Sequence, residues 1–268
     1  MKKAAVLGSP ISHSLSPFIH NYWLKEYGIN GSYEMRSVSQ TGLGDELKKL
    51  VDEGFAGVNL TIPLKQKVIP YIHVMDETAK AIGAVNTLVF ADGVMQGFNT
   101  DAYGFMENLK SVIGNISTLK NGRVVILGAG GAARAIVYAL KKEGFSNIGV
   151  YNRSEKTAKI LAHDFDINIY RKIPEGIDFL VQTTPLGMKG QQPLSFDLSH
   201  MAEGAVIYDI VYNPLMTELL ISSDKAGART VTGLGMLLYQ AVPAFEKFFG
   251  IRPEVTDTLK NACITQLD

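Results

Sequence analysis

A glycine-rich turn between a strand and a helix constrains this sequence more than any other feature. The segment Gly128-Ala129-Gly130-Gly131-Ala132-Ala133 fits the pattern G-x-G-x-x-A. It directly follows the β-branched run 124–127 and opens a stretch of helical composition that ends before Gly144. In this context the pattern is typical of dinucleotide binding, because the glycines let backbone approach a pyrophosphate at a helix N-terminus. A glycine turn without a ligand is the alternative.

The end of the next predicted strand indicates which dinucleotide binds. The strand 148–151 runs into Asn152-Arg153-Ser154, so the carboxylate that usually binds a ribose hydroxyl of NAD is missing from the strand end. The guanidinium of Arg153 suits a 2′-phosphate, and Lys156 adds positive charge. These residues favour NADP(H) over NAD. The alternative is that Arg153 is a solvated charge and Ser154 only caps the next helix.

The pattern around these motifs predicts an α/β protein. In the second part, strands are expected at 123–127, 148–151, 179–182, 205–209 and 229–231, with helices at 132–142 and 154–163. This alternation indicates βαβ units and a parallel sheet. In the first part we expect strands at 6–8, 32–38 and 57–62, a helix at 44–53, and a hairpin of 87–90 with 94–98 around Asp92-Gly93. Ser16 as N-cap and Pro17 at the first helical position predict another helix, and the tail is expected to be helical at 236–249 and 255–267.

Composition excludes several classes of protein. A length of 268 residues is compatible with about two domains. Lys plus Arg and Asp plus Glu both number 26, and this zero net charge argues against nucleic-acid binding or polybasic membrane attachment.

The single cysteine, Cys263, and five histidines without ligand spacing predict neither a disulfide nor a metal site. The apolar run 4–8 is too short for a signal peptide, and with no long apolar stretch we expect a cytoplasmic protein without a membrane span.

Several polar side chains in residues 1–101 occupy positions where the local secondary-structure propensity does not favour them. Asn59 and Thr61 alternate with apolar residues and are expected on one face of a strand, and Lys65 follows them. Asn86 begins a predicted strand, and Asp101 follows the hairpin. Hydroxyls, amides, one lysine and one aspartate form a donor–acceptor set that suits a polyol. Each residue has a structural alternative: helix caps for Ser16 and Asp101, turn residues for Asn86 and Asn99, and a surface lysine for Lys65.

Seven segments spread over nearly the whole chain resemble the shikimate dehydrogenase family. They are GSPISHSLSP at 8–17, NLTIPLK at 59–65, GAVNT at 83–87, GFNTD at 97–101, GAGGAA at 128–133, NRS at 152–154 and GLGMLLYQ at 233–240. The resemblance implies an enzyme that reversibly reduces 3-dehydroshikimate to shikimate with NADPH, in the shikimate pathway toward chorismate and aromatic amino acids. It also implies two domains separated by a cleft: a discontinuous substrate domain at 1–101 and 236–268, and a Rossmann-type, doubly wound NADP-binding domain at 102–235.

The resemblance implies a role for each matching residue. Lys65 is the expected acid/base, paired with Asp101. The expected substrate contacts are Ser14 and Ser16 to the carboxylate, and Asn59, Thr61, Asn86, Tyr212 and Gln240 to or around the ring. The expected cofactor contacts are Gly128, Ala129, Gly130, Gly131, Ala132, Asn152, Arg153, Ser154, Lys156, Thr183 and Gly233. Two departures are visible: Gln182-Thr183-Thr184 replaces the usual Asn-Thr-Thr or Ala-Thr-Ser, and Ser154 replaces a common Thr.

Two other functions remain open at this point. A quinate/shikimate dehydrogenase that tolerates NAD is one, although Ser16 and Arg153 stand where such enzymes tend to carry Thr and an acidic residue. A non-catalytic module that senses NADP is the other, and the Lys65–Asp101 pair argues against it. In each case the expected partners are small molecules, with the chain acting as a monomer or homodimer.

Overall fold

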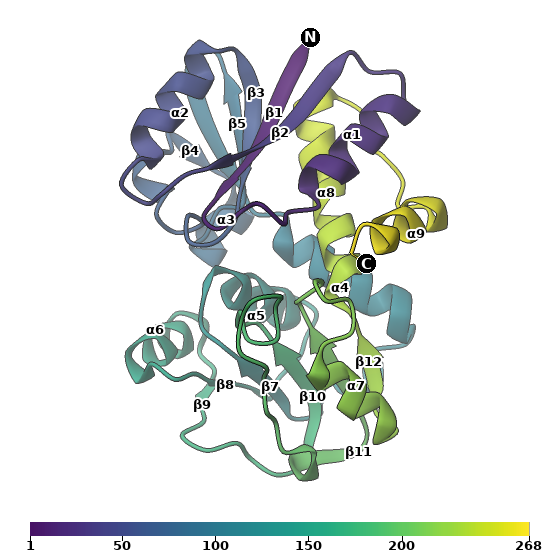
Figure 1. Cartoon of the computed structure of the whole chain (residues 1–268). Coiled ribbons are helices and arrows are strands. Elements are labelled where there is room, and N and C mark those ends of the chain that lie inside the picture. Colours follow the sequence, from purple (N-terminus) through teal and green to yellow (C-terminus); the bar gives the residue numbers. More distant parts are fainter. Residues whose placement is uncertain (268) are drawn as a thin grey trace. The chain divides into compact units, whose positions relative to one another are not determined.

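The computed structural model describes residues 1–267, and they divide into two compact units (Figure 1). The first unit comprises residues 1–101 and 238–266, and the second comprises residues 102–237 together with Leu267. Both passages of the chain between the units lie within helices, α4 (Asp101–Ile113) and α8 (Gly233–Phe249). The second passage, after residue 237, lies two residues beyond the expected boundary at 235.

The first unit is built on a six-stranded mixed sheet in the order β2-β1-β3-β5-β6-β4. Its strands are β1 (Lys2–Gly8), β2 (Gly31–Ser37), β3 (Phe55–Leu60), β4 (Val74–Met75), β5 (Thr87–Ala91) and β6 (Val94–Phe98). The strands β1, β2 and β3 are parallel, whereas β5 pairs antiparallel with both β3 and β6. The turn between β5 and β6 has positive φ at Asp92 (50°) and Gly93 (76°), which confirms the predicted hairpin.

Three helices of the first unit pack against strands of this sheet: α1 (Ser16–Glu26), α2 (Leu43–Asp52) and α3 (Glu77–Ile82). The helix α9 (Asp257–Thr265) packs against α1, and a short 3₁₀ turn lies at Ile69–Tyr71. In α2 the fully buried Leu43, Leu47 and Leu50 belong to the same core as strand residues of β1 and β3. The predicted N-cap of α1 is wrong, because Ser16 already lies inside the helix and Leu15 occupies the cap position without a side-chain bond.

The second unit is built on a six-stranded parallel sheet in the order β9-β8-β7-β10-β11-β12. Its strands are β7 (Val124–Leu127), β8 (Ile148–Tyr151), β9 (Asn168–Ile169), β10 (Ile177–Gln182), β11 (Met201–Asp209) and β12 (Arg229–Val231). The order 3-2-1-4-5-6 is that of doubly wound dinucleotide-binding folds, and it reverses between β7 and β10. This topology confirms the predicted α/β class and the Rossmann-type sheet.

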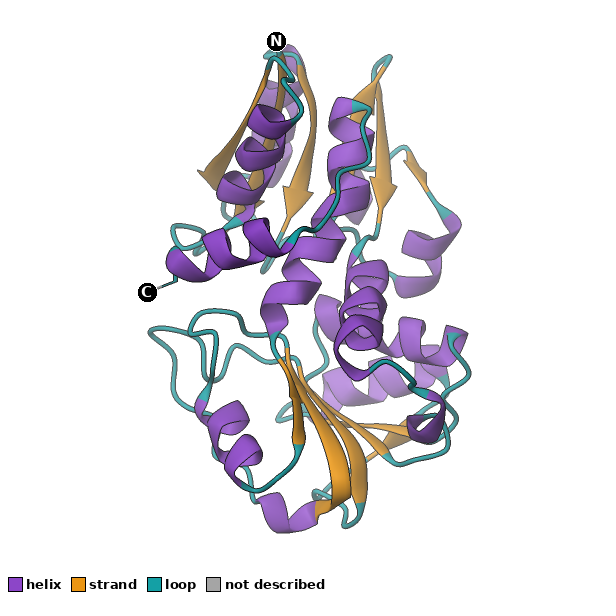
Figure 2. Cartoon of the chain, turned by 90° about the vertical axis from the view of Figure 1, so that its right-hand side faces the viewer, coloured by secondary structure: helices purple, strands orange, loops and turns teal. Residues whose placement is uncertain are grey.

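Helices lie on both sides of this parallel sheet (Figure 2). They are α5 (Gly131–Lys142), α6 (Glu155–Phe165) and α7 (Glu218–Lys225), with short 3₁₀ turns at Ser117–Leu119 and Leu198–His200. The sequence pattern gives no range for α4, and it misses three short elements, β4, β9 and α7. Two-residue strands carry no periodicity, and α7 is only eight residues long. Within residues 1–267, no helix has the length and apolar character needed to cross a membrane.

Candidate active site

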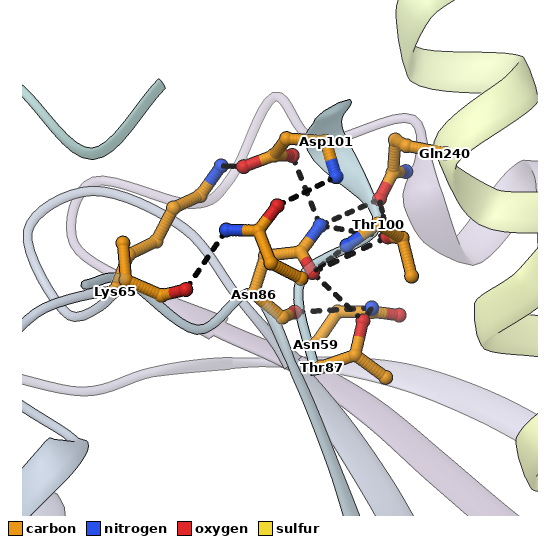
Figure 3. A network of polar contacts seen from close by, with 9 residues as sticks. Asn59, Lys65, Asn86, Thr87, Thr100, Asp101 and Gln240 are labelled. Atoms are coloured by element: carbon orange, nitrogen blue, oxygen red, sulfur yellow. Dashed lines mark hydrogen bonds and ion pairs between the residues drawn. The ribbon is translucent and has the colours of Figure 1, made fainter. Parts of the chain in front are cut away.

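A buried ion pair stands at the centre of the polar residues of the first unit. The Nζ of Lys65 lies 2.6 Å from Oδ2 of Asp101, and these side chains are only 17% and 5% exposed (Figure 3). Lys65 lies in the turn that follows β3, and Asp101 is the first residue of α4. The other carboxylate oxygen, Oδ1, accepts a hydrogen bond from Nδ2 of Asn86 at 2.9 Å. Both oxygens of Asp101 therefore bind donors of this cluster, so helix capping is not what holds its side chain.

Asn86 connects three segments that are far apart in the sequence. It is 2% exposed and immediately precedes β5. Its Nδ2 lies within hydrogen-bond distance of Thr100 Oγ1 (2.8 Å) and Gln240 Oε1 (3.2 Å), as well as Asp101. Its Oδ1 accepts from the backbone N–H of Thr100 at 2.8 Å. The structure thus brings together Lys65, Asn86, Asp101 and Gln240, with Gln240 contributed by α8 (Figure 3).

Asn59 and Thr61 do not share a strand. β3 ends at Leu60, so the expectation that both side chains lie on one strand face is wrong. The side chain of Asn59 is buried, with Oδ1 accepting from Tyr33 and Nδ2 donating to Thr87 Oγ1 at 3.0 Å. Its polar atoms are therefore used within the protein. Its expected contact with substrate stays a prediction.

The serines and Thr61 lie beyond the carboxyl ends of two neighbouring parallel strands. Ser14 and Ser16 follow β1, and the Oγ of Ser14 accepts from the backbone N–H of Ser16 at 3.3 Å. The backbone N–H of Thr61 donates to Leu7 at the end of β1 (2.9 Å), which holds the two connections together. Ser14 and Thr61 are partly exposed, whereas Ser16 is buried. Hydroxyl donors and the Lys65 ammonium thus follow the same edge of the sheet.

The glycine turn of the second unit lies where the strand order reverses. Gly128 has φ +107°, and a Cβ there would stand 2.5 Å from Oγ1 of Thr183, which follows β10 and donates to Leu127 O at 2.7 Å. Gly130 is the N-cap of α5 and supplies no side-chain cap. Apart from its chain neighbours, no heavy atom of the described chain lies within 4 Å of a Cβ built there. Open space at an uncapped helix N-terminus fits a pyrophosphate.

Hydrogen bonds within the segment after β8 hold its conformation. The Nδ2 of Asn152 donates to Ser154 O (2.9 Å) and to Thr157 Oγ1 (2.7 Å). Ser154 occupies the N-cap of α6, yet its hydroxyl forms no cap hydrogen bond, so the capping alternative for this side chain is wrong. Arg153 and Lys156 are exposed. Hydroxyl and cationic groups at the start of a helix are compatible with a bound phosphate.

The loop between β11 and α7 carries Tyr212, which is partly exposed. Asp209, fully buried at the end of β11, holds both ends of this loop: Oδ1 accepts from Val211 N (3.0 Å) and Oδ2 from Thr217 Oγ1 (2.7 Å). Gly233 begins α8, and a Cβ there would stand 2.2 Å from Ile210 O, so only glycine fits against this loop.

Several residues that shape the site were missed in the sequence. Asp209 and Gln182 are register partners at the ends of β11 and β10, and both are fully buried. The side chain of Gln182 binds its own following loop, donating to Leu186 O at 3.0 Å. Tyr33, Thr87 and Thr100 also belong to the polar network of the first unit. A polar residue ending an otherwise apolar predicted strand is the signal that points to Gln182 and Asp209.

Asp209 is expected to make stability fall as pH rises. Burial raises the pKa of its carboxyl from 3.8 to about 6, against the effect of its two hydrogen bonds. Because the native state holds this proton more tightly, the stabilisation is complete below pH 3.8 and lost as pH rises through 6. The shift corresponds to about 3 kcal/mol at most. Urea unfolding of wild type and Asp209→Asn across this range measures it, since wild type should lose stability relative to the variant.

A control for this titration comes from Asp164, a carboxyl whose pKa is lowered and not raised. Asp164 accepts from Arg134 at 2.8 Å, and this hydrogen bond lowers the pKa of Asp164. Wild type should therefore gain stability relative to Asp164→Asn as pH rises, the reverse of Asp209. Parallel pH curves for wild type and Asp209→Asn would show that the Asp209 carboxyl does not titrate abnormally.

Comparison with protein families gives three matches along the chain. Residues 6–88 match the shikimate dehydrogenase substrate binding domain, residues 110–180 match shikimate / quinate 5-dehydrogenase, and residues 233–260 match the shikimate 5′-dehydrogenase C-terminal domain. Among curated proteins, the shikimate dehydrogenase (NADP(+)) of Brucella abortus (strain S19) is 44% identical over 276 residues. That alignment covers 99% of this chain and 95% of the relative.

Solved structures with the same fold carry the ligands expected here. The shikimate 5-dehydrogenase of Thermus thermophilus, in complex with NADP(H) and shikimate, matches with TM-score 0.89 and 36% identity over 100% of both chains. A shikimate dehydrogenase in complex with NADP+ matches with TM-score 0.91 and 34% identity, over 100% of this chain and 96% of that one. The relatives are similar along their whole length, in both units.

Proposed function

The chain belongs to the shikimate dehydrogenase family, and we propose from this premise that it catalyses the reversible NADP(H)-dependent reduction of 3-dehydroshikimate to shikimate. It is an NADP-dependent oxidoreductase that acts on a CH–OH group. The observation that carries the proposal is the buried Lys65–Asp101 pair, which shares one network with Asn86 and Gln240. A structural ion pair alone does not require such a set of amides around it.

Lys65 is the group that handles the proton in this mechanism. When shikimate is oxidised, the neutral Nζ of Lys65 takes the proton of the reacting hydroxyl, and in the reduction the ammonium returns it to the carbonyl oxygen. Asp101 holds the ammonium through Oδ2 at 2.6 Å and thereby fixes the position of Nζ. Bound NADP(H) supplies the hydride chemistry. Proton and hydride together account for the two hydrogens that the alcohol loses.

The remaining side chains bind and orient the substrate. Ser14 and Ser16 donate hydroxyl hydrogens to its carboxylate, and Asn86, Thr61 and Gln240 bind ring hydroxyls. The expected contact of Tyr212 with the ring stays a prediction. Serines provide neutral donors, which leaves Lys65 as the cation of this set. The polar atoms of Asn59, like those of Asn86, have protein partners in this structure, and its expected contact with substrate stays a prediction.

The second unit holds NADP(H) by its glycine turn and by the segment after β8. Gly130 and the N-terminus of α5 receive the pyrophosphate, while Arg153, Ser154 and Lys156 receive the 2′-phosphate. Asn152 shapes this segment through its bonds to Ser154 and Thr157.

One assay tests the proposed function. Purified protein is mixed with shikimate and NADP+, and the formation of NADPH is followed by absorbance, with quinate and with NAD+ as the alternative substrates. Turnover with shikimate and NADP+ that exceeds every other combination is expected. Binding of NADPH without any turnover would support a sensing module instead, and equal rates with quinate would support the broader dehydrogenase.

Replacing Arg153 with alanine should weaken the preference for NADP+. Loss of one charge-assisted hydrogen bond to a phosphate raises KM for NADP+ by about 10- to 100-fold, while KM for NAD+ changes little. Steady-state kinetics with both cofactors measure the ratio. Arg229→Ala, which removes an exposed arginine from β12 in the same unit, is the matched control and should leave both constants unchanged. An unchanged ratio in Arg153→Ala would refute the 2′-phosphate assignment.

We also propose that the protein acts in the cytoplasm as a monomer or homodimer. The support for the cytoplasm is the single cysteine, since Cys263 is a buried free thiol and burial raises its pKa to about 11, which keeps it unreactive. Light scattering on the purified protein measures the oligomeric state.

A further inference from the structure

The polar network of the first unit extends beyond Asn86 to a tyrosine on a different strand. Tyr33 lies in β2 and is 3% exposed, and its hydroxyl donates to Oδ1 of Asn59 at 2.7 Å. The Nδ2 of Asn59 donates to Oγ1 of Thr87 at 3.0 Å, and Thr87 donates in turn to Oδ1 of Asn86 at 3.0 Å. The network therefore reaches across β2, β3 and β5.

From Asn86 the same chain of hydrogen bonds continues to the ion pair. The Nδ2 of Asn86 donates to Asp101 Oδ1 at 2.9 Å, and Asp101 Oδ2 accepts from Lys65 Nζ at 2.6 Å. A continuous path of hydrogen bonds thus joins the Tyr33 hydroxyl to the Lys65 ammonium. Its members are all buried apart from Lys65, which is partly buried, so water competes little for these bonds.

The direction of the donors along this path is fixed by groups that cannot reverse. The Asp101 carboxylate and the backbone carbonyl of Asn86 can only accept, and the backbone N–H of Thr100 can only donate. The Nδ2 of Asn59 lies 3.2 Å from that carbonyl, so its amide cannot turn over without placing two oxygens together. Oδ1 of Asn59 must then face Tyr33, and it needs a donor there. The Tyr33 hydroxyl is that donor.

A histidine and an asparagine hold Tyr33 in place. The ring of His20 stacks on the Tyr33 ring with centroids 4.0 Å apart and planes 6° from parallel. His20 is fully buried, burial lowers its pKa to about 3, and within residues 1–267 its ring nitrogens have no hydrogen-bond partner. The neutral imidazole ring therefore packs on Tyr33 and does not compete for the hydrogen bond that the Tyr33 hydroxyl donates. Asn21 binds the backbone N–H and C=O of Tyr33, at 3.0 and 2.7 Å.

We propose that Tyr33 is a positioning residue for the Lys65–Asp101 pair. By donating to the Asn59 oxygen that those fixed groups leave without a donor, it holds the Asn59 side chain in place. Through Thr87 this supports the position of Asn86, whose Nδ2 faces Oδ1 of Asp101. This leaves Oδ2 directed at Lys65. The inference rests on the proposed function for its kinetic effect, whereas the path itself is a property of the fold. Tyr33 is remote from the reacting groups and acts only through its neighbours.

Tyr33→Phe tests the proposal, because it keeps the ring on His20 and removes only the hydroxyl. We expect kcat for shikimate oxidation to fall about three- to tenfold, the effect of one lost neutral hydrogen bond, with KM for NADP+ unchanged. Tyr208→Phe is the matched control. Tyr208 is a fully buried tyrosine of the second unit whose hydroxyl accepts from Asn108 at 2.6 Å, so its loss should alter stability and leave kcat near wild type.

A double-mutant cycle separates positioning from general support of the fold. If Tyr33 acts through Asp101, then Tyr33→Phe introduced into an Asp101→Asn background lowers kcat by less than about twofold. An equal fractional loss of kcat in both backgrounds overturns the proposal, even where urea unfolding shows coupling. Should wild type fail to oxidise shikimate, the proposed function is refuted. The same cycle measured by urea unfolding then decides the inference: coupling between the substitutions supports the path, and additive effects overturn it.

Discussion

Lys65→Ala is expected to lower kcat for shikimate oxidation by roughly 10²–10⁴, since it removes the group that takes the proton. KM values for shikimate and NADP+ should change much less, because the substrate contacts and the second unit are intact. Stopped-flow or steady-state kinetics of the purified variant measure both. Turnover near the wild-type rate would eliminate Lys65 as the acid/base.

Removing Lys65 also leaves the buried Asp101 without its cation, so a loss of fold must be distinguished from a loss of chemistry. Lys65→Arg keeps a positive charge beside Asp101, yet a guanidinium stays protonated and cannot accept the proton. This variant should fold and bind NADPH while remaining almost inactive. Lys67→Ala removes an exposed lysine of the same turn and should behave as wild type. An active Lys65→Arg enzyme would contradict the proposed proton transfer.

Gly130→Ala should weaken NADP(H) binding more than tenfold without changing stability, because the added methyl group enters space reserved for the pyrophosphate. The structure leaves this space open: φ at Gly130 is −88°, which any residue adopts, and the built Cβ has no non-neighbouring heavy atom within 4 Å. Fluorescence titration with NADPH measures affinity, and thermal unfolding measures stability. Unchanged affinity would mean that no phosphate approaches this backbone.

Gly128→Ala provides the contrast within the same turn. Its φ of +107° is unfavourable for alanine, and the new Cβ would stand 2.5 Å from Thr183 Oγ1. Strain of about 1–3 kcal/mol should therefore appear as lost stability, together with weaker cofactor binding. Alanine at position 128 thus tests what the fold requires, and alanine at position 130 tests what the ligand requires.

The second unit could be predicted from the sequence in most of its elements. Its signals are local, since β-branched runs and glycine turns lie next to each other in the chain, and the hairpin at Asp92-Gly93 in the first unit is of the same kind. Predicted boundaries differ from the observed ones by up to four residues, as where β11 begins at Met201 and not at residue 205. Ser16 illustrates the error: a serine before proline resembles a cap, yet the backbone had already become helical at that residue.

The network of the first unit could not be predicted from local signals. Lys65, Asn86, Asp101 and Gln240 come from segments that meet only in the folded chain. Residue types alone grouped the first three as a possible polyol site, whereas adding Gln240 depended on the family resemblance. The structure adds what such a resemblance lacks, namely the direction of each hydrogen bond. The distinction between Asn59, which is saturated by protein partners, and the serines, which are not, is of this kind. Nothing in the sequence pointed to a role for Tyr33 in the site, because a tyrosine in a strand is an ordinary core residue.

The passage of the chain through α4 and α8 has a consequence for synthesis on the ribosome. Residues 102–237 are contiguous, so the second unit is complete while residues 238–266 are still to be made. Synthesis of the first unit begins before that of the second unit and finishes after it. Phe248, which packs where Gly57 leaves room, and Gln240, which binds Asn86, both lie in the segment that is translated after the second unit. The unit whose synthesis begins first thus acquires its complete catalytic network only after the second unit has been made.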